Sequence, residues 1–113
     1  MSITRGTDNV FADLGYADAA DRQTKLRLAY AINGIIKKQR WTQAEAARRL
    51  GTGQPKVSAL ARYRLEGFSV ERLMAFLVAL DRDVEIVIRK KPRGQRPAHV
   101  RVVLNRSAAG RST

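Results

Sequence analysis

The stretch 42–62 constrains the fold of this chain most, because it carries the signals for two short helices joined by a tight turn. Thr42 and Glu45 form the pattern of a capping box, in which each side chain can bond the backbone amide of the other residue. Gly51 can end the first helix in a left-handed conformation. Pro55 falls in the first turn of the next helix, where a missing amide hydrogen costs little. The two predicted helices cover residues 42–50 and 54–62.

The apolar residues of this stretch indicate how the two helices cross. Ala47 is small enough for the place where the two backbones come closest. Val57 and Leu60 lie three residues apart on the second helix, so both can pack under the first. This is the spacing of a helix-turn-helix, in which the second helix enters the major groove of DNA. A capped helix pair with a glycine turn also occurs as a plain scaffold, so the spacing alone leaves both interpretations open.

The other faces of the pair suit DNA. Gln54 can pair with adenine, Lys56 can reach a guanine or a phosphate, and the Ala59 methyl group can touch a thymine methyl. Taken singly, Gln54 and Ser58 could also be ordinary solvated residues. Gln43 opens the first helix, where backbone amides favour a phosphate, and residues 62–64 could clamp the DNA backbone. The predicted DNA-binding residues are Gln43, Gln54, Lys56, Ser58, Ala59, Arg62, Tyr63 and Arg64.

The charge balance points to a polyanion as partner. The chain of 113 residues has 22 Lys and Arg against 10 Asp and Glu, a formal net charge of +12. Nucleic acid is the commonest polyanion, and anionic membrane is its rival. The basic segment 89–111 could be a solvated tail, a second phosphate contact or an RNA-binding segment, and it lacks the amphipathic stripe of a membrane-binding helix. We therefore expect double-stranded DNA as partner and no membrane.

Two further helices are predicted on either side of this unit. The first covers about residues 19–39, with Asp18 as its cap and Leu28, Ile32 and Ile35 on one apolar face. The second starts after Ser69, which can cap it. It places further apolar residues at helical spacing, namely Leu73, Phe76, Leu77 and Leu80.

After residue 82 the apolar pattern changes to period two, which is typical of a strand. Val84, Ile86 and Ile88 alternate first, and a second alternation over 100–104 could be the return arm of a hairpin, although the loop between them is long. An unpaired strand edge invites pairing with a second copy, so these residues are the expected dimer seam. The predicted parts are an N-terminal arm (1–18), a helix-turn-helix domain (19–82), a C-terminal β element (83–106) and a disordered tail (107–113).

Several function classes are excluded by what the chain lacks. It has no cysteine and a single histidine, His99, so a metal site is not expected. Phosphate-binding loops and hydrolase motifs are missing, so we expect neither an enzyme with catalytic residues nor a cofactor. No apolar run is long enough to span a bilayer, and the N-terminus has no signal-peptide core. These features predict a cytoplasmic, nucleoid-associated protein.

Two stretches of the central unit, 41–47 and 51–58, resemble the Cro and lambda-repressor-type (XRE) helix-turn-helix family. The flanking stretches 9–15, 67–73 and 83–89 resemble its HigA-like antitoxin subgroup. The resemblance implies a mainly α, lambda-repressor-like domain of four or five helices, followed by a short C-terminal β-strand or hairpin.

The resemblance also implies a function. It implies a bacterial or phage repressor that binds a palindrome-like operator as a homodimer. It further implies neutralisation of a RelE- or HigB-like toxin encoded beside it, in a type II toxin-antitoxin pair. The alternatives are a stand-alone phage or cellular repressor and a partner-binding antitoxin with secondary DNA binding. The chain departs from the family pattern at Thr52, Gly53 and Tyr63, where the family usually has an apolar residue, serine and glycine.

Overall fold

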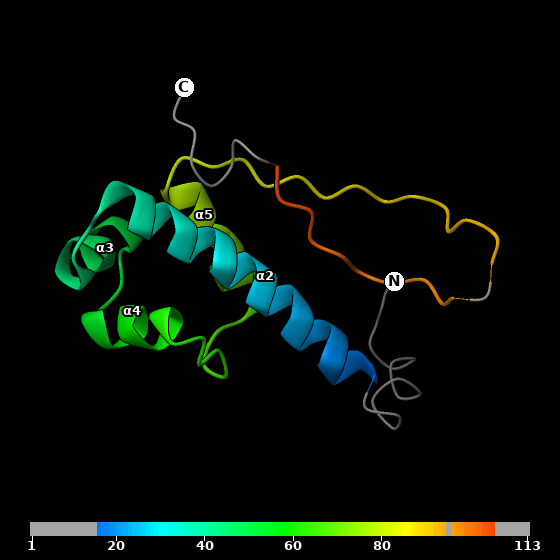
Figure 1. Cartoon of the computed structure of the whole chain (residues 1–113), viewed down its shortest axis with the longest axis horizontal. Coiled ribbons are helices and arrows are strands. Elements are labelled where there is room, and N and C mark those ends of the chain that lie inside the picture. The colour runs from blue at the N-terminus through cyan, green and yellow to red at the C-terminus, as the bar shows by residue number, and fades with distance from the viewer. Residues whose placement is uncertain (1–15, 95, 106–113) are drawn as a thin grey trace.

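The computed structural model describes residues 16–94 and 96–105, and its centre is the long helix α2, Tyr16–Gln39 (Figure 1). Leu28, Ile32 and Ile35 are buried on one face of α2, as their helical spacing predicts. The helix begins before Asp18, so the prediction that Asp18 caps it is wrong. Nothing in the sequence between Tyr16 and Asp18 breaks a helix, and the helical bonding therefore extends past the expected cap.

The predicted helix pair is present as α3, Gln43–Leu50, and α4, Gln54–Ala61. Thr42 caps α3, because its side-chain oxygen accepts a hydrogen bond from the Glu45 amide at 3.1 Å. Gly51 ends α3 with φ +72°, and the amides of residues 51 and 52 donate to carbonyls of the last turn at 3.3 and 3.0 Å. The chain can therefore reverse within three residues and start α4.

Helix α5, Val70–Ala79, packs along α2. The Ser69 side chain accepts from the Arg72 amide at 3.0 Å, which confirms the predicted cap. Leu73, Phe76 and Leu77 are buried against the rest of the core. In this arrangement α2 packs on α4 and α5, and α3 packs on α4 and α5.

One core joins all four helices of the described part. Its largest fully buried side chains are Ile32, Ile35, Leu60 and Leu73, from α2, α4 and α5. The side-chain amide of Asn33 donates to the Leu60 carbonyl at 3.0 Å and ties the end of α4 to the C-terminal half of α2. The position of α4 is therefore set by both apolar packing and a polar bond.

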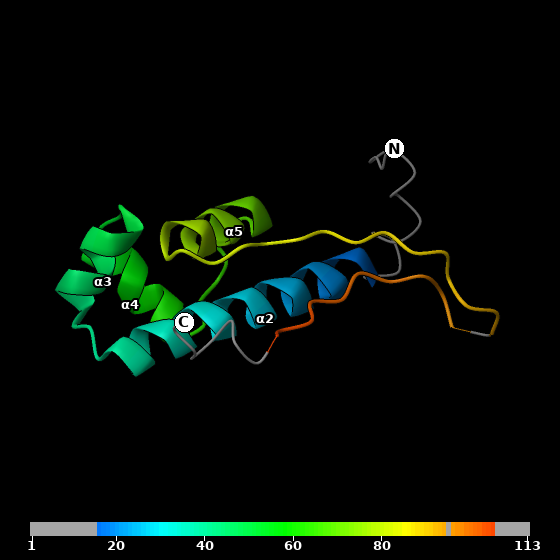
Figure 2. The ribbon, with the colours of Figure 1, turned by 90° about the horizontal axis from the view of Figure 1, so that it is seen from above.

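The predicted C-terminal β element is not found. Residues 82–93 and 96–105 are extended and run back past each other in opposite directions (Figures 1 and 2), but no strand is formed within the described residues. Ile86 is 75% and Ile88 91% exposed, so neither is buried against the part of the chain that the structure describes. A strand needs ladder hydrogen bonds from a partner, and among residues 83–94 and 96–104 no backbone hydrogen bond joins the two stretches.

The predicted alternation of buried and exposed side chains is present in the second stretch, residues 96–105. Val102 and Leu104 are half-buried and pack against the core, whereas Val103 between them is 71% exposed. The 1–15 part of the predicted arm, and the tail over 107–113, lie outside the described residues.

Candidate nucleic-acid interface

Helices α3 and α4 form the predicted two-helix unit. Ala47, expected where the helices come closest, is buried, and so is its neighbour Ala46. Val57 and Leu60 are 2% and 0% exposed, so the inner face of α4 is the one that the spacing predicts. The opposite face of α4 carries exposed residues, among them Gln54 and Arg62.

The open face of α4 carries residues at four-residue steps. Gln54 and Arg62 are exposed, and Ser58 between them is half-buried. Such steps place the three side chains in one row along the helix. Pro55 and Ala61 are also exposed and flank this row, although sequence reasoning did not select them for DNA contact. Their exposure depends on which face packs, and a full helical-wheel projection from Val57 and Leu60 would have found it.

Lys56 and Ala59 do not join that row. The Lys56 ammonium donates to the Gly67 carbonyl at 2.9 Å and lies 4.6 Å from the centre of the Phe68 ring. This side chain therefore links α4 to the loop before α5. Ala59 is half-buried against the core, which leaves its methyl group little surface for a base.

The chain turns sharply where α4 ends. Arg62 caps the helix, and Tyr63 adopts a left-handed conformation with φ +59°. The Tyr63 and Arg64 amides then donate to carbonyls of α4, at 3.0 and 2.9 Å. Arg62 and Arg64 are both exposed at this end, and Tyr63 is 39% exposed. The backbone at Tyr63 thus adopts the left-handed conformation that glycine adopts most easily, although the residue is not a glycine.

Gln43 lies apart from α4, at the exposed first residue of α3. Amides of a first helical turn carry partial positive charge, and a phosphate suits that position. Gln43 and the α4 row therefore occupy the start of one helix and the open face of the other.

A cluster on α3 adds fixed positive charge. The Glu45 carboxylate accepts from Arg48 at 2.5 Å and from Arg49 at 2.7 Å. These two guanidinium groups lower the pKa of Glu45 to about 2. Arg49 also lies 4.6 Å from the centre of the Trp41 ring, and Trp41 packs against the core. Glu45 is thus held by the arginines, in place of the predicted return bond to the Thr42 amide.

Comparison with known proteins identifies this architecture. A family model described as a helix-turn-helix domain matches residues 10–89. A solved structure described as an XRE-family transcriptional regulator matches with a TM-score of 0.75 and 66% sequence identity. That match covers 78% of this chain and 99% of the other. The chain belongs to the XRE family of helix-turn-helix regulators. Comparison with curated proteins gives no match.

Membership of the XRE family makes this protein a regulator of the DNA-binding type, a type that is not typically enzymatic. Over residues 16–94 and 96–105, no group of three or more acidic or histidine side chains could hold a metal ion. Within the same residues, none of the helices has the length and apolar character needed to cross a membrane.

Proposed function

We propose that this XRE-family protein reads a specific operator by placing the open face of α4 in the major groove. The observation that carries the proposal is the row of Gln54, Ser58 and Arg62 on the side of α4 that faces away from the core. Gln54 stands at the N-terminal end of α4, the end from which helix-turn-helix proteins contact base edges. Its amide can both donate to and accept from an adenine.

The other predicted site residues then take supporting roles. Arg62 and Arg64 at the end of α4 contact the DNA backbone, and so does Gln43 at the start of α3. The left-handed turn at Tyr63 separates the two arginines, and we assign it to directing the chain at this end of α4. We assign Lys56 to positioning α4, because its ammonium already has the Gly67 carbonyl and the Phe68 ring as partners. Ala59 is assigned to packing rather than to base contact, since its side chain is half-buried against the core.

We also propose that the protein acts as a homodimer. Ile86, Val87 and Ile88 are 75%, 62% and 91% exposed in an extended segment with free ladder positions. Pairing of this segment with a second copy would bury the apolar side chains and supply the ladder bonds. Two α4 helices about 34–36 Å apart would then match a palindrome-like site on a chromosome.

The test is selection of bound duplexes from a random DNA pool at near-physiological salt. Wild type should enrich an inverted repeat, and Gln54→Ala should alter or lose that sequence. Gln39→Ala is the matched control, because it makes the same substitution at an exposed helical residue outside α4. Equal retention by all three proteins without enrichment would reduce the binding to phosphate attraction and overturn the proposal.

A narrower role is favoured by the resemblance of 67–73 and 83–89 to HigA-like antitoxins. In this role the protein neutralises a RelE- or HigB-like toxin and represses the operon that encodes both. Co-expression with a small toxin encoded next to it should give a stable complex that co-purifies. A dimer that binds its operator but captures no such toxin would be a stand-alone repressor. Toxin capture without sequence-selective DNA binding would instead make it a partner-binding antitoxin.

A further inference from the structure

The extended stretch after α5 contains a segment that can form ladder hydrogen bonds, and the chain itself fixes both ends of this segment. At one end, the Arg82 amide already donates to the Leu77 carbonyl at 2.9 Å. At the other end, Pro92 has no amide hydrogen. Among the described residues, no backbone hydrogen bond engages residues 83–91. This ladder segment, 83–91, is therefore available for pairing along its whole length, and its middle residue is Val87.

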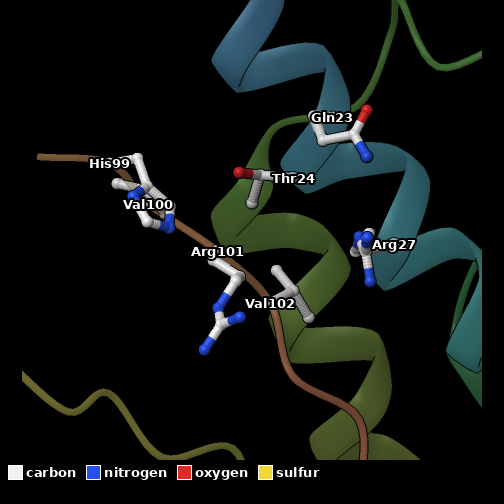
Figure 3. Close-up of a pocket in the computed structure, with 7 residues that line it drawn as sticks. All are labelled: Gln23, Thr24, Arg27, His99, Val100, Arg101 and Val102. Carbon is white, nitrogen blue, oxygen red and sulfur yellow. The ribbon is translucent and has the colours of Figure 1, made fainter. Parts of the chain in front are cut away.

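The 96–105 stretch of the same chain is not the partner of the ladder segment. It lies along α2, and its residues 99–102 line a pocket together with Thr24 and Arg27 of that helix (Figure 3). Val102 packs against the core. No backbone hydrogen bond joins residues 96–104 to the ladder segment, and this stretch contains no acidic residue. It therefore has no carboxylate to offer to the basic residues of the ladder segment.

The ladder segment has opposite charges placed symmetrically about its middle. Glu85 and Arg89 lie two residues before and after Val87, and Asp83 and Lys91 lie four residues before and after it. None of these charged side chains has an ion pair within the described part of one chain. Two antiparallel copies centred on Val87 place Glu85 opposite Arg89 and Asp83 opposite Lys91. Two-fold symmetry makes each pair occur twice, with Cβ atoms about 4.5–5.5 Å apart.

The same register brings the apolar side chains together on the other face of the ribbon. Residues 84, 86 and 88 alternate with the acidic ones, so they share the opposite face. Ile86 then lies opposite Ile88 of the second copy, and Lys90 ends this face opposite Val84. Ile86 and Ile88 are 75% and 91% exposed in one chain, whereas Val84 packs against the core. The apolar face of the ribbon therefore continues from the core of the domain.

We propose that the ladder segment binds the same segment of a second copy in one antiparallel register, centred on Val87, and that its charge pairs select this register. The inference rests on the proposed homodimer and specifies how the chain recognises its own copy. The free backbone groups supply the ladder bonds, the isoleucines supply apolar contact, and the acids and bases exclude other alignments.

Other alignments leave charged groups without a partner. A ladder centred on Ile86 places Glu85 opposite Val87, and a ladder centred on Ile88 places Arg89 opposite Val87. A slip of one residue turns the apolar faces of the two copies to opposite sides of the ribbon. Parallel pairing in register places each charge opposite a like charge, which is destabilising. Only the register centred on Val87 places a base of the ladder segment opposite each of its acids.

The first experiment measures self-association of the full chain by analytical ultracentrifugation at low ionic strength, where exposed ion pairs are screened least. Glu85→Arg and Arg89→Glu should each weaken the dimer by about tenfold, because each puts two pairs of like charges in the ladder. The double variant should regain wild-type association. An equimolar mixture of the two single variants should also regain it, as a heterodimer in which every Glu85–Arg89 position again carries opposite charges.

The matched control is Glu66→Arg, which makes the same charge reversal at an exposed residue outside the ladder segment. It should associate as wild type does. An equal weakening by Glu66→Arg would assign the effect to net charge and overturn the proposed register.

A second experiment tests the register through cross-linking, because the chain has no cysteine of its own. Val87→Cys places two sulfur atoms opposite each other, on Cα atoms about 4.5–5.5 Å apart, within the range that a disulfide spans. This variant should cross-link under mild oxidation. Glu85→Cys is the control, because its two copies would lie four residues out of step, about 13 Å apart along the ribbon.

The outcomes separate the register from the homodimer on which it rests. A monomeric wild type would overturn both. A dimeric wild type whose association is unchanged by both charge reversals would overturn the register alone. Cross-linking through Glu85→Cys and not through Val87→Cys would do the same, because it would show a dimer paired in another alignment.

Discussion

At the scale of single residues, Tyr63 shows how the chain departs from its family and still makes the same turn. It has φ +59°, in the region where a side chain costs about 1–2 kcal/mol. The bonds from its amide and from that of Arg64 to α4 hold this conformation. The sequence indicates that a non-glycine residue stands at a position where the family usually has glycine. Only the backbone conformation shows that Tyr63 nevertheless has a positive φ.

We expect Tyr63→Gly to be more stable than Tyr63→Ala, by about 1 kcal/mol. Both variants lose the same ring, so the comparison isolates the backbone conformation. Denaturant unfolding of the two proteins measures the difference. A more stable alanine variant would mean that φ at this position is not positive in solution.

Glu45 allows a prediction about pH. Its pKa is about 2 in the folded protein and near the usual 4.5 when the chain is unfolded, so deprotonation favours the fold. The stabilisation is complete above about pH 4.5 and is lost as the pH falls toward 2. Glu45→Gln should therefore lose less thermal stability than wild type between these pH values.

Glu71→Gln is the control for this comparison, because Glu71 is an exposed acid in the first turn of α5. It should follow the wild-type pH profile more closely. Parallel profiles for wild type and Glu45→Gln would show that the arginine pairs do not act in solution, where exposed ion pairs are screened.

At the scale of elements, the helix pair shows that local sequence signals can specify where two helices begin and end. The Thr42 cap, the Gly51 turn and Pro55 specify α3 and α4 from contacts within a few residues, and the structure has both helices where the sequence predicts them. The start of α2 was predicted less well. A favourable cap such as Asp18 does not stop a helix when the residues before it can also be helical.

Gly51 provides the prediction at this scale. A Cβ at this position would meet no atom within 4 Å, so Gly51→Ala changes only the cost of φ +72°. We expect a loss of about 1 kcal/mol in the free energy of unfolding. Gly53→Ala should cost less, because φ there is −89°, which alanine adopts readily. Similar losses for both variants in denaturant unfolding would contradict a specific role of the left-handed turn.

At the scale of the whole molecule, the apolar side chains of segment 86–88 remain exposed to solvent in a single chain. Ile88 is 91% exposed, so replacing it should leave the monomer fold intact. We expect Ile88→Lys to convert a dimer into a monomer with unchanged helical content, measured by light scattering and circular dichroism. Val78→Lys, at a 60% exposed position of α5, should remain dimeric. A dimeric Ile88→Lys protein would place the interface elsewhere.

The sequence by itself determined the capped helix pair, the inner face of α4, the Ser69 cap and the positive charge. These depend on contacts between near neighbours or on composition. Only the tertiary structure decided that Lys56 is held by Phe68, that α2 and residues 99–102 share a pocket, and that the 84–88 alternation forms no strand. Each of these depends on contacts with residues distant in the sequence or with a pairing partner. A local sequence pattern does not specify which distant residues will be in contact.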